Sequence, residues 1–256
     1  MVKTVSLSHP PDGDPAKSDG ETDIAARVAG LDWATLARAL DAQGCATTGA
    51  LLTPPECVSL QDLYRAEDLF RSRIVMARHG FGRGEYKYFG YPLPKLVALL
   101  RAALYPPLAQ IANRWNDAMG IAVRYPATHA SYLARCHAAG QRKPTPLLLQ
   151  YGSGDYNCLH QDVYGEHVFP LQVAILLSEP DCDFTGGAFV LTEQRPRMQS
   201  RAEVVAFARG EAVIFPVRHR PVAGTRGSYR VNMRHGVSRL HSGQRHTLGI
   251  IFHDGA

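Results

Sequence analysis

The apolar positions of this chain change their spacing about half-way along its 256 residues. Over residues 33–40 they occupy positions i, i+3, i+4 and i+7, which predicts a helix that ends at Gly44. Residues 53–56 read Thr-Pro-Pro-Glu and have the form of a helix-capping box, so a second helix is expected from there to about residue 70. Residues 73–78 form a short run rich in branched side chains, which favours a strand.

Residues 81–91 combine three glycines with aromatic and charged side chains. The glycines argue against a regular element, and the composition suits a surface loop that closes over a site. Aromatic residues that simply pack on the core are an equal alternative. An apolar helical stretch begins at Pro94 and is expected to break at Pro106 and Pro107, before another helix over residues 111–119. Helices therefore dominate the predicted first half.

The second half contains six short apolar segments with the length and composition of β-strands. Turn signals rich in glycine, serine and aspartate separate several of them. Short strands at this spacing indicate a sandwich or a barrel, so an α+β protein is expected. The predicted strands cover residues 147–151, 171–177, 187–191, 212–215, 230–233 and 247–252.

The composition fits one globular domain, because 45% of the residues are hydrophobic and 20% are charged. Residues 1–23 are rich in proline, glycine and aspartate and are expected to be a disordered tail. Residues 24–256 are expected to form a single domain, in which 24–125 supply helical support and a lid and 126–256 supply the strand core. No apolar run approaches the roughly 20 residues that cross a bilayer, so no membrane partner is expected and a cytoplasmic location follows by default.

The cysteines and the net charge constrain the function only weakly. The five cysteines include no C-x-x-C pair, which favours reduced, structural thiols. The net charge of +5 permits attraction to a polyanion. No helix-turn-helix, zinc-finger or RNP-type signature accompanies it, so a DNA-binding protein without chemistry is not expected. The cysteines are Cys45, Cys57, Cys136, Cys158 and Cys182.

The pattern that points most directly to chemistry is His160-Gln161-Asp162. In a strand, residues two apart project from the same face, so His160 and Asp162 can meet one ion while Gln161 points away. The third ligand must come from far along the chain; His235, which closes a predicted strand, is preferred, and His241 is the alternative. Two imidazoles and one carboxylate are the ligand set of a mononuclear non-haem Fe(II) site. Three further histidines stay open: His219, His246 and His253.

Arg245 lies ten residues beyond His235 and carries a fixed, always-charged fork that can grip the carboxylate of a keto acid. In the last predicted strand it shares one face with Thr247, whereas the opposite face is apolar enough to lie against helices. A structural ion pair is the alternative role for Arg245. Tyr151 ends the strand before the metal motif and either donates its hydroxyl to the same ligand or is a core aromatic.

Together, these segments resemble the Fe(II)/2-oxoglutarate-dependent dioxygenase superfamily. The resemblance covers about residues 147–253. Four features carry it. The first is a segment that contains a tyrosine, a glycine turn and the H-x-D motif, and the second is a strand with two glycines. The others are the strand before the distal histidine, His235, and the spacing from His235 to Arg245. It implies a double-stranded β-helix, the jelly-roll or cupin-like barrel, with the N-terminal helices packed on one sheet. The four segments are residues 151–162, 186–189, 210–215 and 235–245.

Further features of the resemblance concern the substrate. Residues 84–89 and 91–94 are similar to a bacterial branch of the superfamily that is labelled as acting on damaged nucleic acid. The H-Q-D form, with a tyrosine eleven positions before Asp162, resembles the alkylation-repair (AlkB-like) dioxygenases. Those repair enzymes place their arginine further beyond the distal histidine and follow it with a second one. The ten-residue spacing here is closer to that of prolyl-hydroxylase-like enzymes.

The resemblance implies hydroxylation of a C–H bond by O₂, with 2-oxoglutarate converted to succinate and CO₂ and ascorbate supporting activity. Among the possible reactions, oxidative demethylation of alkylated nucleic acid, a DNA-repair reaction, is preferred. The reasons are the excess of basic over acidic residues and the aromatic and basic side chains of residues 83–91. The site residues implied are His160, Asp162 and His235 for Fe(II), and Arg245, Tyr151 and Thr247 for 2-oxoglutarate.

Other functions stay open from the sequence alone. A protein side-chain hydroxylase of the prolyl type is the leading alternative, and a small-molecule hydroxylase is another. A non-catalytic, cupin-like metal-binding sensor explains the histidines and the strands but leaves Arg245 without a task. The sequence does not indicate an oligomeric state.

Overall fold

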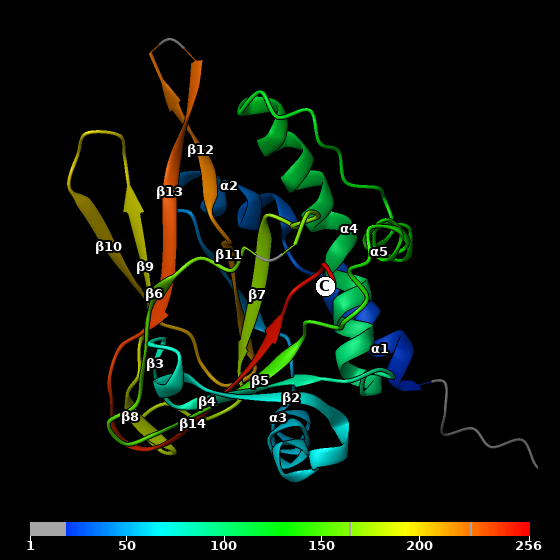
Figure 1. The fold of residues 1–256 in the computed structure, drawn as a ribbon, viewed down its shortest axis with the longest axis vertical. Helices are drawn as coiled ribbons and strands as arrows, with labels where there is room; N and C mark the ends of the chain where they lie inside the picture. The colour runs from blue at the N-terminus through cyan, green and yellow to red at the C-terminus, as the bar shows by residue number, and fades with distance from the viewer. Residues whose placement is uncertain (1–18, 164, 226) are drawn as a thin grey trace, which may run out of the picture.

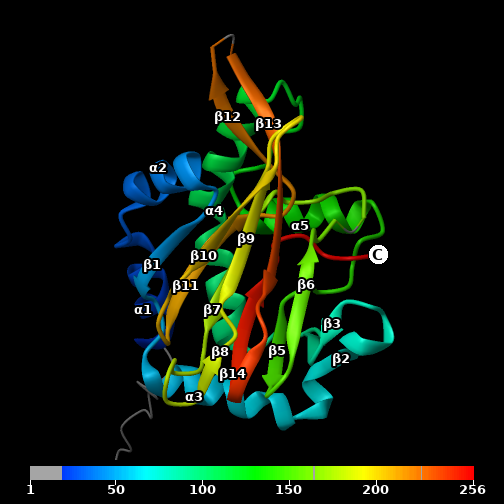
Figure 2. The same cartoon turned by 90° about the vertical axis from the view of Figure 1, so that its left-hand side faces the viewer.

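The computed structural model describes residues 19–163, 165–225 and 227–256. Three layers follow one another across the molecule: a smaller antiparallel sheet, a larger antiparallel sheet, and helices packed behind the larger sheet (Figure 1). A view turned by 90° shows the smaller sheet in front of the larger one (Figure 2). The helices are α1 (Asp19–Ala29), α2 (Trp33–Gln43), α3 (Pro54–Asp62), α4 (Lys95–Ala118) and α5 (His129–Ala138).

The sheets confirm the expected combination of helices with antiparallel strands, and each of the six predicted strand segments overlaps a strand. The larger sheet has the order β1 (Ala46–Ala50), β11 (Glu211–Pro216), β7 (Leu171–Leu176), β14 (Leu240–Ile250), β5 (Leu147–Gly152), β4 (Glu85–Phe89) and β2 (Phe70–Val75), with β8 (Phe184–Gly186) paired to β14. The smaller sheet has the order β10 (Ser200–Val205), β9 (Phe189–Gln194), β13 (Gly227–Val237), β6 (Tyr156–His160) and β3 (Gly82–Arg83), with β12 (His219–Gly224) paired to β13.

The main core lies between the larger sheet and the helices. Leu248 and Ile250 of β14 are fully buried there against Leu100 and Leu104 of α4. They alternate with residues that face the other way, as the period of a strand requires. Each such side chain contributes about 1.5–3 kcal/mol when it leaves water. The prediction that one face of the last strand lies against helices is therefore confirmed.

The sequence signals for α2 and for the start of α3 are confirmed. Gly44 follows α2 with φ of 82°, the left-handed conformation that glycine adopts without strain. Thr53 and Glu56 form the reciprocal capping box of α3. However, α3 ends at Asp62 rather than near residue 70, and short 3-10 turns follow it. The ammonium of Lys87 donates to the carbonyl oxygen of Tyr64 at 2.9 Å, so a residue distant in the sequence contacts the backbone just beyond the end of α3.

The predicted break at the two central prolines is wrong, because α4 runs through Pro106 and Pro107 as one helix. Proline has a helical φ, and its cost inside a helix is the lost N–H and the crowding of the preceding turn. Burial offsets that cost, since Tyr105 and Leu108 on either side of the prolines are fully buried in the main core. Local sequence rules do not register this long-range compensation.

The predicted loop over residues 81–91 is also wrong in part, because β3 and β4 lie within it. Gly82 has φ of 124°, and a Cβ there would meet the carbonyl oxygen of Tyr156 at 2.3 Å, so glycine permits the close pairing of β3 with β6. The aromatic residues that follow alternate along β4. Tyr86 and Tyr88 face a cavity between the sheets, whereas Lys87 faces away from it.

Two further expectations are corrected by the strand and helix boundaries. The strands predicted over residues 230–233 and 247–252 are longer on their facing sides than expected, because β13 continues to Val237 and β14 already begins at Leu240. At the N-terminus, α1 begins at Asp19, inside the segment expected to be a tail, and residues 1–18 lie outside the described residues. Among the described helices, none combines the length and hydropathy needed to span a membrane. All five cysteines are free thiols.

Candidate metal centre and adjoining cavity

Three side chains converge where β6 and β13 pair. His160 ends β6 and is the direct ladder partner of His235 on β13. Asp162 lies two residues beyond the end of β6. The prediction placed His160 and Asp162 within one strand, whereas in the structure the strand ends at His160 and Asp162 follows it. Its Oδ1 is 3.4 Å from Nε2 of His160, and its Oδ2 is 3.3 Å from Nε2 of His235. One donor atom from each residue therefore lies within 4.8 Å of the others.

The close approach of the two strands depends on Gly236, which follows His235. A Cβ at Gly236 would meet the carbonyl oxygen of Asn157 at 2.6 Å. The register between β13 and β6 shifts at this point, which is typical of a bulge that re-aims side chains near a site. Glycine and the register shift together let His235 and His160 face each other with ring centroids 4.2 Å apart.

The protonation of the three side chains suits a cation. Nδ1 of His160 lies 2.8 Å from the carbonyl oxygen of Cys158, so a ring N–H there leaves Nε2 facing Asp162. Burial alone would raise the pKa of Asp162, but hydrogen bonds from His160 and His235 hold it well below its usual range. Burial lowers the pKa of His235. Burial also opposes protonation of His160, but Asp162 outweighs it and raises the pKa, so a metal entering at low pH would displace a proton.

The other histidines considered as ligands lie elsewhere. His241 is exposed, and Nε2 of His246 contacts the amide of Gln150 at 3.0 Å. His219 belongs to β12, and His253 accepts a backbone hydrogen bond. Among the described residues, His160, Asp162 and His235 are the only group of histidine, cysteine or acidic residues whose donor atoms could hold one metal ion.

The three side chains open into a cavity of about 420 Å³ between the two sheets. Arg245, Thr247 and Gly249 line it from one face of β14, and Ile251 lines it just beyond the end of that strand. Gly187 makes room beside the arginine: its φ is 61°, and a Cβ there would lie 3.1 Å from Cδ of Arg245. The cavity therefore has the candidate metal centre and a guanidinium in its walls.

Arg245 is a buried cation without a carboxylate partner among the described residues. Only 2% of it is exposed, Nη1 donates to Oγ1 of Thr247 at 2.6 Å, and Nε has no partner. Burial lowers its pKa to about 10. Holding a charge out of water without a counter-ion is costly, so the site calls for an anion from outside the chain. The alternative role of Arg245 in a structural ion pair has no support among the described residues.

Tyr151 lies beside Arg245, because the two are ladder partners on β5 and β14. It is fully buried in the cluster of apolar residues between the sheets, and its hydroxyl has no hydrogen-bond partner within the described part of the chain. Burial raises the pKa of this hydroxyl, so it remains a neutral donor. Arg245 and Tyr151 thus bring unsatisfied donors to one place beside Thr247, which fits the far carboxylate of 2-oxoglutarate.

Sequence reasoning missed several residues that line the same cavity. Gln172 is the one polar residue of β7, only 4% exposed, and Nε2 of its amide has no partner. Tyr86 and Tyr88 were placed in a loop, although their two-residue spacing was a strand signal. A lone polar position in an apolar strand, and the alternation of the tyrosines, were the available clues.

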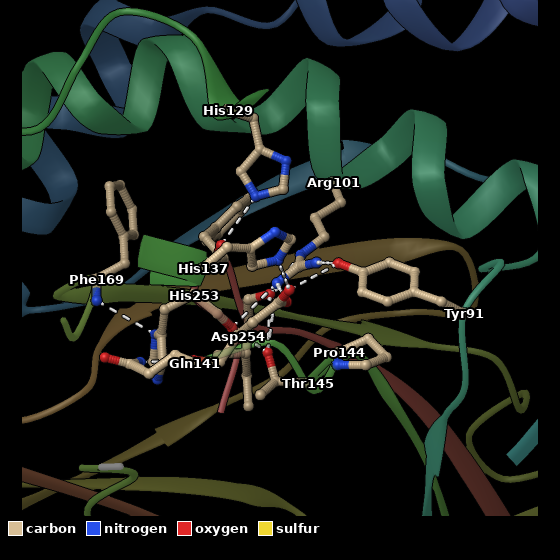
Figure 3. A network of polar contacts seen from close by, with 12 residues as sticks. Tyr91, Arg101, His129, His137, Gln141, Pro144, Thr145, Phe169, His253 and Asp254 are labelled. Atoms are coloured by element: carbon tan, nitrogen blue, oxygen red, sulfur yellow. Dashed lines mark hydrogen bonds and ion pairs between the residues drawn. The ribbon is translucent and has the colours of Figure 1, made fainter. Parts of the chain in front are cut away.

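A buried polar network lies behind the cavity, where the C-terminal residues meet α4 and α5 (Figure 3). The carboxylate of Asp254 is fully buried and binds Nη2 of Arg101 at 2.9 Å and Nε2 of His137 at 2.7 Å. Nε of Arg101 donates to the carbonyl oxygen of Ile251 at 2.8 Å. Because Ile251 lines the cavity, the network holds that wall in place.

The same network reaches the segment that follows Asp162 (Figure 3). Oε1 of Gln141 accepts the N–H of His167 at 2.7 Å, and Nε2 donates to the carbonyl oxygen of the same residue at 3.1 Å. The N–H of Phe169 donates to Nδ1 of His253 at 3.2 Å. Burial lowers the pKa of His253 to about 4, which keeps it a neutral acceptor. His253 therefore supports the backbone beyond Asp162.

A model of the family described as "Oxygenase, catalysing oxidative methylation of damaged DNA" matches residues 84–255, more than half of the chain. The chain belongs to this family. Two uncharacterized proteins of Mycobacterium tuberculosis, from strains CDC 1551 and H37Rv, are each 48% identical to this oxygenase over 168 residues. The match covers 66% of this oxygenase and 72% of each relative.

Solved structures with a similar fold include a prolyl-4-hydroxylase of Pseudomonas putida, with a TM-score of 0.51, 15% identity and coverage of 87% of this oxygenase and 100% of that chain. An oxidoreductase of the 2OG-Fe(II) oxygenase family from Burkholderia pseudomallei has a TM-score of 0.51, 16% identity and coverage of 88% and 93%. A Trichoplax adhaerens prolyl hydroxylase, in complex with a hypoxia inducible factor peptide fragment, has a TM-score of 0.52, 14% identity and coverage of 93% of both chains.

These likenesses show the fold, and the family match shows an oxygenase. The family match confirms the predicted resemblance to an oxygenase branch labelled as acting on damaged nucleic acid. The protein is therefore an oxygenase, a kind of oxidoreductase, and its His-Asp-His group could hold a metal ion.

Proposed function

We propose that this oxygenase hydroxylates a C–H bond of an alkylated nucleobase and thereby removes the alkyl group. Its two sheets would form a double-stranded β-helix, with the N-terminal helices on the larger sheet. The observation that carries the proposal is that a candidate metal site and a candidate anion site line the same cavity. Arg245 offers an unpaired buried charge to an anion, and the His-Asp-His group offers three donors to a metal.

In this proposal His160, Asp162 and His235 hold Fe(II). The set of two imidazoles and one carboxylate leaves open positions on the metal for ligands that the protein does not supply. The hydrogen bond from Nδ1 of His160 to the carbonyl oxygen of Cys158 fixes the ring, so that Nε2 faces Asp162. Phe215 packs against His235 with ring centroids 4.6 Å apart and holds it from the other side.

Arg245, Tyr151 and Thr247 would bind the carboxylate of 2-oxoglutarate that is distant from its keto group. The guanidinium supplies charge-assisted hydrogen bonds, and the hydroxyl of Tyr151 supplies another. Thr247 already accepts from Nη1 of Arg245 at 2.6 Å and so aims the guanidinium into the cavity. Burial strengthens these contacts because water competes little for the donors.

Bound Fe(II) would supply the activation of O₂, with one oxygen atom ending in succinate and the other in the hydroxylated substrate, as 2-oxoglutarate loses CO₂. The residues of the chain position the reactants and exclude water from them. Apolar cavity residues such as Leu147, Leu149 and Val173 serve the second task. Hydroxylation of an N-methyl group gives an unstable product that releases formaldehyde, which completes the demethylation.

Three observations support a nucleobase substrate. The family description names damaged DNA. Tyr86 and Tyr88 give the cavity an aromatic wall, and Phe81 at its edge is 47% exposed; such rings stack on an unpaired base. The net charge of +5 favours a polyanion. The proposed role is therefore in DNA repair.

A protein side-chain hydroxylase remains the second candidate. The ten-residue spacing from His235 to Arg245 favours it. Membership of an oxygenase family speaks against the non-catalytic sensor. The test is succinate formation with Fe(II), 2-oxoglutarate and ascorbate, using methylated single-stranded oligonucleotides and proline-containing peptides as substrates. Turnover that depends on the methylated oligonucleotide supports the proposal, and turnover that depends only on the peptide contradicts it.

A further inference from the structure

Gln172 is a buried amide that the proposed metal and 2-oxoglutarate sites do not use. It is the only polar residue in a strand that otherwise reads Leu-x-Val-Ala-Ile-Leu, it lines the cavity, and it is 4% exposed. Its Nε2 has no hydrogen-bond partner among the described residues. An unsatisfied buried donor costs free energy, so its presence at a cavity wall indicates a ligand group that satisfies it.

Strand register places Gln172 close to the candidate metal centre. Gln172 is the ladder partner of Phe215 on β11, and the ring of Phe215 contacts the ring of His235 with centroids 4.6 Å apart. Gly249 on β14 is the ladder partner of Ala174, which lies two residues from Gln172 on β7. Arg245 lies four residues before Gly249, about 13 Å along β14 from this position. Gln172 is therefore near the reacting end of the cavity, away from the donors that would bind the tail of 2-oxoglutarate.

Tyr88 faces Gln172 across a small apolar floor. Tyr88 on β4 pairs with Leu147 on β5, which pairs in turn with Gly249 on β14. Gly249 pairs with Ala174 on β7, and Ala174 is two residues from Gln172 on the same face of that strand. Three strand spacings separate the two sides, roughly 14 Å between backbones. Once the side chains are counted, this gap suits a flat ring that lies on an apolar floor, which the side chain of Leu147 forms where it covers Gly249.

The tyrosine side of this gap is itself held in place. Tyr86 and Tyr88 pack edge to face, with ring centroids 5.4 Å apart and an interplanar angle of 89°. The guanidinium of Arg71 lies over the ring of Tyr88, with Cζ 4.6 Å from its centroid, and its Nε donates to the carbonyl oxygen of Pro144 at 2.8 Å. Aromatic rings with a neighbouring cation favour a heterocycle attached to a phosphate chain.

We propose that Gln172 is a substrate-binding residue that recognises the hydrogen-bonding edge of an alkylated nucleobase lying against Tyr86 and Tyr88. The carboxamide offers one donor and one acceptor side by side, which matches adjacent acceptor and donor groups on a base. A prolyl side chain has no such edge. This inference rests on the proposed nucleic-acid substrate and deepens it, because it names the group that selects the base.

The test replaces the amide by an apolar group of similar size, Gln172→Leu, with Gln172→Met as a second variant in case the first folds poorly. Gln194→Leu, at an exposed glutamine of β9, is the matched control. For each protein, kcat and KM are measured on methylated single-stranded DNA. Two further readouts are the affinity for the same oligonucleotide by fluorescence anisotropy, in the absence of 2-oxoglutarate, and the affinity for 2-oxoglutarate by calorimetry.

We expect both Gln172 variants to lose about 10- to 100-fold in kcat/KM and in oligonucleotide affinity, the loss that follows removal of a two-point contact to a base. Their affinity for 2-oxoglutarate should match the wild type, and their melting temperature should be equal or higher, because an unsatisfied buried donor has been removed. Gln194→Leu should match the wild type in every readout. Unchanged oligonucleotide affinity and kcat/KM overturn the inference. A parallel fall in 2-oxoglutarate affinity also overturns it, because Gln172 would then bind the keto acid.

The wild-type measurements separate this inference from the proposed function. If wild-type protein turns over methylated DNA while the Gln172 variants are unaffected, the proposed function stands and the role of Gln172 is wrong. If the wild type acts only on peptides, the nucleic-acid substrate is wrong, and the recognition of a base by Gln172 is overturned with it.

Discussion

Arg245 and Tyr151 are ladder partners on β14 and β5, and each brings a polar atom without a partner to the same cavity. A buried guanidinium beside a buried hydroxyl destabilises the chain unless an anion satisfies both. We therefore propose that the pair marks the place of a carboxylate in this oxygenase. The predictions that follow separate the anion site, the metal site and the network that supports them.

Removal of the charge at Arg245 should weaken the binding of 2-oxoglutarate without harming the fold. Arg245→Ala deletes charge-assisted hydrogen bonds worth about 1.5–3 kcal/mol each, so the Kd measured by calorimetry should rise at least 10-fold. The melting temperature of the ligand-free protein should stay the same or rise, because a buried charge without a carboxylate has been removed. Arg239→Ala, at an exposed arginine in the turn before β14, is the control. Wild-type affinity in Arg245→Ala would mean that the anion binds elsewhere.

The hydroxyl of Tyr151 should contribute to the same affinity on a smaller scale. Tyr151→Phe removes one neutral donor, so the Kd for 2-oxoglutarate should rise about 3- to 10-fold, the equivalent of roughly 1 kcal/mol. Tyr132→Phe is a matched control, because Tyr132 is also buried with an unpartnered hydroxyl but belongs to the core between α4 and α5. Equal effects of the two variants on affinity would contradict a specific role for Tyr151.

Loss of a metal ligand should abolish turnover and leave the protein folded. Asp162→Ala removes the carboxylate that lies between His160 and His235, and the strands around it remain packed. Under anaerobic conditions Fe(II) should raise the melting temperature of the wild type, because a ligand that binds only the folded state stabilises it by about 2.7 kcal/mol at 100 times its Kd. The variant should show no such rise. A variant that still gains stability from Fe(II) would place the metal at another site.

A fall in pH should lower the free energy of unfolding before it protonates most carboxylates, because buried histidines lie in the polar network behind the cavity. Burial lowers the pKa of His129 and of His253 to about 4, whereas an unfolded histidine titrates near 6.5. Both therefore contribute stability that is fully present above about pH 6.5 and is lost as the pH falls toward 4. Each contributes at most about 1.4 kcal/mol per pH unit to the unfolding free energy over this window.

Urea unfolding at half-unit steps of pH checks this. His129 is the cleaner position to change, because its Nε2 hydrogen-bonds a backbone atom, the carbonyl oxygen of Phe252, at 2.8 Å. His129→Gln should flatten the slope between pH 6.5 and 4, and His241→Gln, at an exposed histidine, should leave it unchanged. An equal slope in the wild type and His129→Gln would show that His129 is not held neutral by burial.

The sequence was most informative where the candidate site depends on the spacing of residues that are close together in the chain. The two-residue step from His160 to Asp162, and the alternation along β14 that turns Arg245 and Thr247 inward, are local patterns, and the structure brings these side chains to one cavity. Their roles as ligands remain proposals. The preference for His235 over His241 rested on its place in a strand, and the structure brings His235, rather than His241, beside Asp162.

Features that depend on distant contacts were missed. The helix through Pro106 and Pro107 is sustained by burial that local rules do not include. The strand β3 pairs with β6, and β4 pairs with β5, over separations of about 60 to 75 residues. The proposed role of Gln172 follows only from strand register. Asp254 looks like an ordinary acidic residue near the C-terminus, yet it is fully buried with Arg101. Such placements arise from the fold as a whole.

The most direct test of the account is an anaerobic calorimetric titration of 2-oxoglutarate into the Fe(II)-loaded wild type and Asp162→Ala, with iron bound per chain measured in parallel. We predict one Fe(II) per wild-type chain and one 2-oxoglutarate per Fe(II), and neither in the variant at the same free concentrations. Equal iron content in both proteins, or binding of 2-oxoglutarate that is indifferent to Asp162, would contradict the shared cavity of metal and keto acid.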